Sequence, residues 1–210
     1  MSHELPSFLI DAGELLQHVS RVVYRGSPLY YGHSSTNRYD DPAGAYGVLY
    51  LGRDLPTALM ESVFHKHKWL EDKKRSIALE EVQARMVRAV GVMADVLLAD
   101  LTAPGVMAGQ FGLNLEQLAS RDYTHTQQVS AQVHAIRGND GQPLFDGVLY
   151  PSRNNYPAAS IALFERAGTK ISVIEDIDLA DHLDWPRFVA TYRVGIEPDP
   201  GPVESEDEAS

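Results

Sequence analysis

The segment from Arg38 to Glu61 constrains the fold most, because it predicts a loop, a strand and a helix in immediate succession. The loop contains several turn-forming residues, namely Asp40, Asp41, Pro42 and Gly44. An apolar strand over residues 47–52 follows, and Pro56 begins a helix expected over residues 55–67. The segment should therefore bring a guanidinium, aromatic rings and a carboxylate together within a short length of chain.

This combination of side chains suits a phosphorylated ribosyl ligand. Arginine pairs with phosphate through a planar fork of donors, and tyrosine stacks or hydrogen-bonds. A carboxylate stabilises positive charge that develops on a sugar ring. The residue types alone thus favour a site for such a ligand.

Three side chains of the segment each allow a plainer interpretation. Arg38 could pair with a neighbouring loop carboxylate, and Tyr50 could be a half-buried strand residue, since it points away from its two leucine neighbours. Tyr46 is a weaker candidate for the stacking role of Tyr50. Glu61 stands among apolar residues, where a carboxylate needs a partner. The periodicity of the helix does not decide whether Glu61 faces solvent.

The remaining chain predicts interleaved strands and helices without a regular βαβ period, which favours an α+β fold. We expect one domain over residues 1–195 and an acidic, Pro-rich, disordered tail over 196–210. The expected helices are 6–20, 113–118, 126–137 and 178–184, with a helix over 79–88 as an alternative to a strand. The expected strands are 21–25, 83–90, 96–99, 147–150, 160–164, 171–177 and 187–194, and a long polar loop covers 27–46.

Composition restricts the classes of function. The chain has 210 residues, 44% of them hydrophobic and 22% charged, as in globular proteins. Its net charge of −11 argues against general affinity for nucleic acid or anionic membranes. The absence of cysteine makes a reducing cytoplasm the default location. We see neither a signal peptide nor an apolar run long enough to span a membrane.

Several common sites are absent from the sequence. His65 and His67 would diverge on a helix and do not form an H-E-x-x-H zinc site, so no metal is expected. Neither a phosphate-binding P-loop nor a G-x-G-x-x-G dinucleotide motif occurs. No G-x-S-x-G elbow supports a serine hydrolase.

A series of short motifs, in order, resembles the RES-domain family, the toxin half of RES–Xre toxin–antitoxin pairs. The matching residues are Tyr24-Arg25-Gly26, Arg38-Tyr39, Leu49-Tyr50, Thr57-Ala58-Leu59-Met60-Glu61, and then Gly147, Tyr150, Ser152 and Arg153. Tyr39 departs from the usual Phe or Trp but keeps an aromatic plane. The match in order and spacing covers most of residues 21–175.

The resemblance implies a fold similar to ADP-ribosyltransferases, with a split β-core and a cleft that holds NAD. It implies that Arg25 and Arg38 face the ligand and that Ser152 hydrogen-bonds it. Tyr50 would stack on the nicotinamide or the adjacent ribose, and Glu61 would stabilise the sugar during bond cleavage. These roles are expectations carried over from the family.

The resemblance also implies an activity and a partner. A type II toxin of this family would cleave the nicotinamide–ribose bond of NAD and transfer ADP-ribose to water, phosphate or a protein target. An Xre-type antitoxin would inhibit it. The alternatives are a non-catalytic NAD-binding or regulatory module and an RNase toxin. An RNase is disfavoured because basic clusters and a plausible histidine pair are missing.

Overall fold

The computed structural model describes residues 5–64 and 75–198. One sheet has eight strands in the order β1-β6-β7-β8-β3-β2-β5-β9, and β10 pairs with β4 in a parallel two-stranded sheet. The strands are β1 (Ser7–Ile10), β2 (Leu15–Arg21), β3 (Val48–Gly52), β4 (Arg75–Ala78), β5 (Arg85–Val92), β6 (Val96–Asp100), β7 (Gly147–Pro151), β8 (Ala159–Phe164), β9 (Ile171–Asp178) and β10 (Val194–Glu197). The α-helices are α1 (Leu55–Glu61), α2 (Leu79–Gln83), α3 (Val106–Phe111), α4 (Leu115–Ala119), α5 (Thr124–Ala135) and α6 (Trp185–Tyr192).

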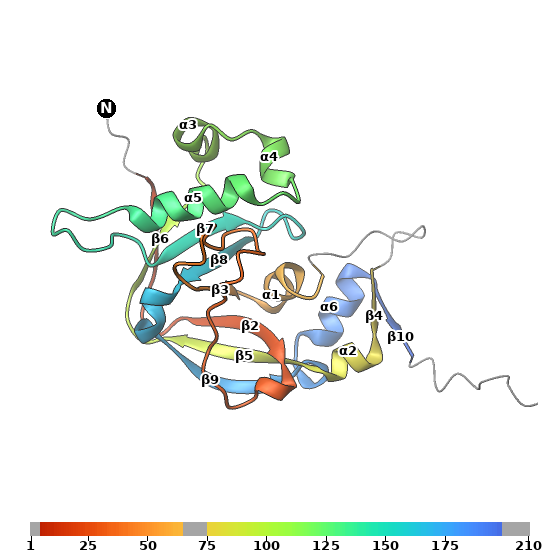
Figure 1. The fold of residues 1–210 in the computed structure, drawn as a ribbon. Coiled ribbons are helices and arrows are strands. Elements are labelled where there is room, and N and C mark those ends of the chain that lie inside the picture. The colour runs from red at the N-terminus through yellow and green to blue at the C-terminus, as the bar shows by residue number, and fades with distance from the viewer. Residues whose placement is uncertain (1–4, 65–74, 199–210) are drawn as a thin grey trace, which may run out of the picture.

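The large sheet is almost divided between β2 and β3. Among the described residues, these strands pair only through Gln17 and Gly52. On either side the pairing is extensive, since β2 pairs with β5 along its whole length and β3 with β8 likewise. Figure 1 shows the two parts diverging, with β6, β7, β8 and β3 above and β2, β5 and β9 below. The expected single-domain α+β fold with a split β-core is confirmed.

Strand β3 distributes its side chains to two cores, as the alternation of a strand requires. Val48 and Tyr50 pack in the cluster that α3 and α5 cover. Leu49 and Leu51 pack on the opposite face against residues of β2, β5, β6 and β8. A third core, beneath α1 and α6, includes Leu59 and Phe188.

Helix α1 bridges the point where β2 and β3 part, because it contacts both strands (Figure 1). The Asp54 side chain caps the helix by accepting the Thr57 N–H at 2.8 Å. Gly52 permits its close approach to β3, since a Cβ there would lie 2.5 Å from the Ala58 nitrogen. These contacts place the end of α1, and hence Glu61, at the split.

Three expected elements are wrong. Residues 6–20 form β1 and most of β2, and residues 22–24 form a 3₁₀ turn instead of a strand. Residues 187–194 were expected as a strand, but most of them belong to α6, which begins beside Pro186. For residues 6–20 the pairing partners decided, since β1 pairs with β6 and β2 with β5, both distant in sequence.

Most other expected elements are confirmed within a few residues, among them the strands at 47–52, 83–90, 147–150, 160–164 and 171–177 and the helix at 126–137. Helix α1 ends at Glu61, sooner than expected, because the Ser62 hydroxyl donates to the Ala58 carbonyl at 2.6 Å. Residues 65–67 of that expected helix lie outside the described residues. Strand β10 reaches Glu197, two residues into the expected tail. The tail from residue 199 onward also lies outside the described residues. The division into domain and tail stays a prediction. None of the described helices is both long and apolar enough to cross a membrane.

Candidate active site

A cavity of about 210 Å³ lies at the split between β2 and β3. Side chains from both parts of the sheet, from α1 and from the loops around it form its wall. The lining residues are His18, Asn37, Arg38, Tyr50, Glu61, Ser62, Tyr123, Tyr150 and Arg153. The cavity thus brings together Arg38, Tyr50 and Glu61, the three residues that the sequence assigned to catalysis.

Glu61 is the last residue of α1 and faces this cavity. Its carboxylate accepts a hydrogen bond from the Ser152 hydroxyl at 2.7 Å and a long contact from the Tyr150 hydroxyl at 3.4 Å. In the described part of the chain no cation pairs with it. A negative charge at a helix C-terminus is electrostatically unfavourable, so the position suits a carboxylate that acts on a ligand.

Ser152 holds Glu61 in place. Its side chain is buried, donates to Glu61, and accepts the Asn155 N–H at 3.1 Å. The hydroxyl proton is therefore committed to the carboxylate, and Ser152 does not line the cavity. Its expected hydrogen bond to the ligand stays a prediction.

Arg38 reaches the cavity, and no carboxylate within residues 5–64 and 75–198 pairs with it. Its guanidinium donates to the Pro151 carbonyl at 3.2 Å and to the Leu118 carbonyl at 3.0 Å. The guanidinium carbon also lies 5.4 Å from the centre of the Tyr39 ring and 5.5 Å from that of Tyr150. The plainer interpretation, an ion pair with a loop carboxylate, is not what the structure shows.

A buried carboxylate, Asp40, orders the loop that carries Arg38. It accepts the backbone N–H groups of Thr36 and Asn37 at 3.0 and 2.8 Å, and the Tyr50 hydroxyl at 2.9 Å. The Tyr50 oxygen in turn accepts the Tyr39 N–H at 2.9 Å. Burial, and then Asp40, raise the pKa of Tyr50 well above its ordinary value. Tyr50 is thus a neutral phenol whose hydroxyl is hydrogen-bonded to Asp40 and to the Tyr39 N–H. Its ring is the part that can contact a ligand in the cavity.

Tyr150 is a site residue that the sequence marked only as part of a motif. Its ring centre lies 4.5 Å from that of Tyr39. Burial, followed by the charge of Glu61, raises the pKa of Tyr150 well above its ordinary value. It therefore remains a proton donor toward Glu61 at neutral pH.

His18 connects the two parts of the sheet where their backbones separate. Its Nδ1 lies 2.9 Å from the Tyr50 carbonyl oxygen, which can only accept, so Nδ1 carries the proton and neutral His18 has a free acceptor at Nε2. Burial lowers the pKa of His18. The residue also borders a second cavity of about 520 Å³. Sequence reasoning missed His18 because its segment was expected to be helical.

The second cavity extends from His18 along the segment that follows β2. Its other lining residues are Ser20, Tyr24, Ser27, Pro28, Leu29, Tyr30 and Arg88. Because His18 lines both cavities, they are neighbours, and we refer to them as the two chambers of the candidate site. Neighbouring chambers suit a ligand made of two linked parts.

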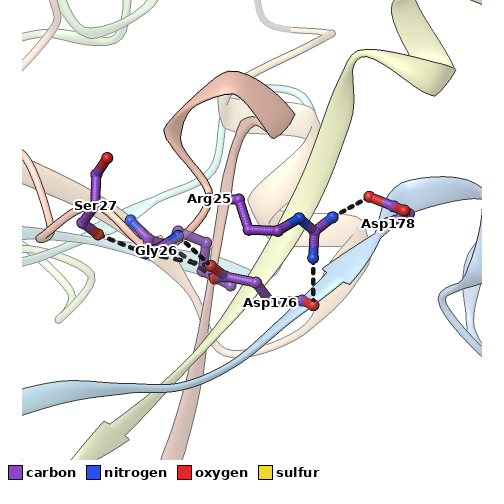
Figure 2. Close-up of polar contacts among 6 residues, drawn as sticks. Arg25, Gly26, Ser27, Asp176 and Asp178 are labelled. Carbon is purple, nitrogen blue, oxygen red and sulfur yellow. Dashed lines mark hydrogen bonds and ion pairs between the residues drawn. The ribbon is translucent and has the colours of Figure 1, made fainter.

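Arg25 lines neither chamber. Its guanidinium forms an ion pair with the Asp178 carboxylate and donates to the Asp176 carbonyl at 2.9 Å (Figure 2). The Asp176 carboxylate accepts the Gly26 N–H at 3.3 Å and pairs with buried Arg88 at 2.8 Å. Arg25 thus fastens the segment after β2 to β9, and direct contact of Arg25 with the ligand stays a prediction.

Tyr46 also lies away from the chambers. Its ring stacks on His134 of α5 at 3.7 Å, and its hydroxyl lies 3.1 Å from that of Ser130. Burial raises the pKa of Tyr46 to about 12. The structure therefore does not bring Tyr46 together with Arg38 and Glu61, and its expected role in ligand binding stays a prediction.

A family model described as the RES domain matches residues 15–186. The chain belongs to the RES-domain family. The structure also resembles a solved toxin chain. The structural alignment covers 88% of this chain and 91% of that chain, with a TM-score of 0.57 and 15% sequence identity. That structure is the M. tuberculosis MbcT–MbcA toxin–antitoxin complex. At this identity the likeness shows a common fold. No functionally curated protein matches the sequence.

Other parts of this RES-domain protein contain fewer side chains that could take part in a reaction. A further cavity of about 680 Å³ is lined in part by β1, β6, α3 and α5, and Arg137 alone is charged among its described lining residues. Within residues 5–64 and 75–198 no cluster of three or more His, Asp or Glu side chains could hold a metal ion. The two-chambered site beside Glu61 is therefore the candidate active site.

Proposed function

We propose that this protein is the toxin of a toxin–antitoxin pair and that it cleaves the nicotinamide–ribose bond of NAD. The observation that carries the proposal is the lining of one cavity by Glu61 and Arg38, a carboxylate and a guanidinium that have no ion-pair partner among the described residues. A ligand with both a cationic sugar centre and anionic phosphates complements such a cavity.

The chemistry follows from the charges. When the bond between C1′ and the nicotinamide nitrogen breaks, its electron pair leaves with the nicotinamide, which becomes neutral. Positive charge then develops on the ribose, as in glycoside cleavage. The Glu61 carboxylate stabilises that charge, and Ser152 and Tyr150 hold the carboxylate in position.

The acceptor completes the reaction. Water, inorganic phosphate or a protein side chain adds to C1′, and a hydroxyl acceptor releases its proton. Tyr50 and Tyr150 cannot take this proton, because their raised pKa values keep both as neutral phenols. Neutral His18 is the nearby group with a free acceptor nitrogen. The two chambers, both lined by His18, match the two-part shape of NAD.

An inhibitory partner belongs to the same proposal. An unrestrained NAD-consuming enzyme would poison its own cytoplasm, so such a toxin needs an antitoxin. The similar fold was solved in complex with an antitoxin. The net charge of −11 would favour a basic partner surface, and an Xre-type protein is the expected partner.

The deciding experiment incubates the purified protein with NAD, with and without inorganic phosphate, and identifies the products by chromatography. We expect free nicotinamide together with ADP-ribose, a phosphorylated ADP-ribose, or label transferred to protein in lysate. Each product identifies one acceptor. NAD that binds without being consumed would contradict the proposal and favour a non-catalytic binding module.

A cellular experiment tests the toxin role separately. Expression of the chain alone should arrest growth and deplete NAD, and co-expression of its operon neighbour should restore both. Harmless expression of the verified wild-type sequence would contradict the role. Glu61→Gln, expressed at the same level, is the matched control and should be tolerated.

A further inference from the structure

Two arginines of the active-site cavity hold the same short stretch of chain. Arg38 donates to the Leu118 carbonyl at 3.0 Å, and Arg153 donates to the carbonyls of Ala119 and Ser120, both at 3.0 Å. Both arginines line the cavity beside Glu61. The residues that they bind form the C-terminal end of α4 and its cap.

Neither guanidinium has an anionic partner among the described residues. Arg153 otherwise contacts the Tyr123 hydroxyl at 3.3 Å and lies 5.9 Å from the centre of its ring. The Nε of Arg38 is buried and has no hydrogen-bond partner. In a chain with a net charge of −11, two arginines in one cavity bonded only to neutral groups are well placed to attract an anion.

The carbonyl end of α4 is the nearest substitute for that anion. The last carbonyls of a helix have no partner within the helix and carry partial negative charge. Leu118, Ala119 and Ser120 present three such oxygens to the two guanidiniums. A phosphate offers full negative charges with similar acceptor geometry, and it therefore competes favourably for the same donors.

We infer that Arg38 and Arg153 form a two-arginine anion site, in which the carbonyl end of α4 occupies the place that the diphosphate of the substrate takes. Arg153 is then a further ligand-binding residue, and residues 115–123 are released when the anion binds. The identity of the diphosphate as that of NAD rests on the proposed function. The two-arginine site itself rests on the contacts above.

The first test measures binding of inorganic pyrophosphate by calorimetry to the wild type and to R153Q, R153K and R137Q. Arg137 is the matched control, because it also donates to backbone carbonyls, of His134 and Ile136, but lies outside the active-site cavity. We expect R153Q to weaken binding by about tenfold to a hundredfold, the range of one charge-assisted contact. R153K should fall between, and R137Q should match the wild type.

The second test follows amide hydrogen exchange over residues 115–123 in the wild-type protein. Pyrophosphate should increase exchange there, because the arginines leave the α4 carbonyls. Bound pyrophosphate with unchanged exchange would overturn the displacement. In the binding test, R153K retains the positive charge. If R153Q loses pyrophosphate binding, R153K keeps it, and both variants unfold at the normal temperature, the charge of Arg153 is the cause.

The outcomes separate this inference from the proposed function. If NAD is consumed but R153Q binds pyrophosphate as tightly as R137Q does, the two-arginine site is wrong and the function stands. If pyrophosphate binds through Arg153 but NAD is not consumed, the anion site stands and the function is wrong. A wild-type protein that consumes NAD yet binds no pyrophosphate also overturns the anion site.

Discussion

Arg25 and Arg38 both come from motifs of the RES-domain family, and the structure places them in opposite electrostatic settings. Arg25 is paired with Asp178 and bound to the Asp176 carbonyl (Figure 2). In the described part of the chain, Arg38 contacts neutral carbonyls and aromatic faces beside Glu61. A guanidinium already paired with a carboxylate stabilises the fold, whereas one bonded to neutral groups keeps its charge available for a ligand.

The largest effect is expected for Glu61, the carboxylate that shares the cavity with Arg38. Glu61→Gln keeps the size of the side chain but removes its charge and replaces one of its two acceptor oxygens with an NH2 donor. If the carboxylate stabilises a cationic sugar, the rate of NAD cleavage should fall by about 10²–10³-fold with little change in folding. Turnover assays on purified protein measure this, with Glu175→Gln on the exposed face of β9 as control. Turnover near that of the wild type would remove Glu61 from the mechanism.

Substitutions of the carboxylates around Arg25 should change the stability of the protein. Asp176→Asn deprives buried Arg88 of its carboxylate and should lower the free energy of unfolding by about 1.5–3 kcal/mol. Asp178→Asn breaks only the exposed pair with Arg25 and should cost less than about 1 kcal/mol. Urea denaturation measures both. Equal losses would mean that burial does not distinguish the two carboxylates.

Substitution of each arginine tests the comparison directly. Arg38→Ala should weaken NAD binding by about tenfold to a hundredfold, because it removes a charge from the cavity. Arg25→Ala should act only through the position of the segment after β2, so its effect on affinity should be smaller. Calorimetry with NAD measures both. An equal or larger loss for Arg25→Ala would mean that Arg25 contacts the ligand, as the family resemblance implies.

The smallest effect concerns pH and His18, which lines both chambers. Burial lowers the pKa of His18 below its ordinary value of 6.5, so the unfolded chain binds more protons there than the folded one. Stability should therefore fall as the pH drops below about 6.5, and His18→Gln should reduce that slope. His134 and His182, whose pKa values burial also lowers, should maintain a residual slope. Urea denaturation at several pH values would contradict this if the slopes were identical.

The sequence alone determined the part of the site that is local in the chain. The loop, β3 and α1 follow from turn residues, strand alternation and a helix start at Pro56. These signals act over a few residues, so they can be interpreted without knowledge of the rest of the fold. They placed Arg38, Tyr50 and Glu61 close together in the chain, whereas the direction of Glu61 came from the family resemblance, and all three line one cavity.

The tertiary structure decided everything that depends on partners distant in sequence. Residues 6–20 became strands because β5 and β6 supply their hydrogen bonds. Arg25 acquires its partners because β9 brings the Asp176 carbonyl and the Asp178 carboxylate to it, and Arg153 lines the cavity while it donates to the carbonyls at the end of α4. A local pattern shows what a side chain can do, but only the packed chain decides which partner satisfies its charge.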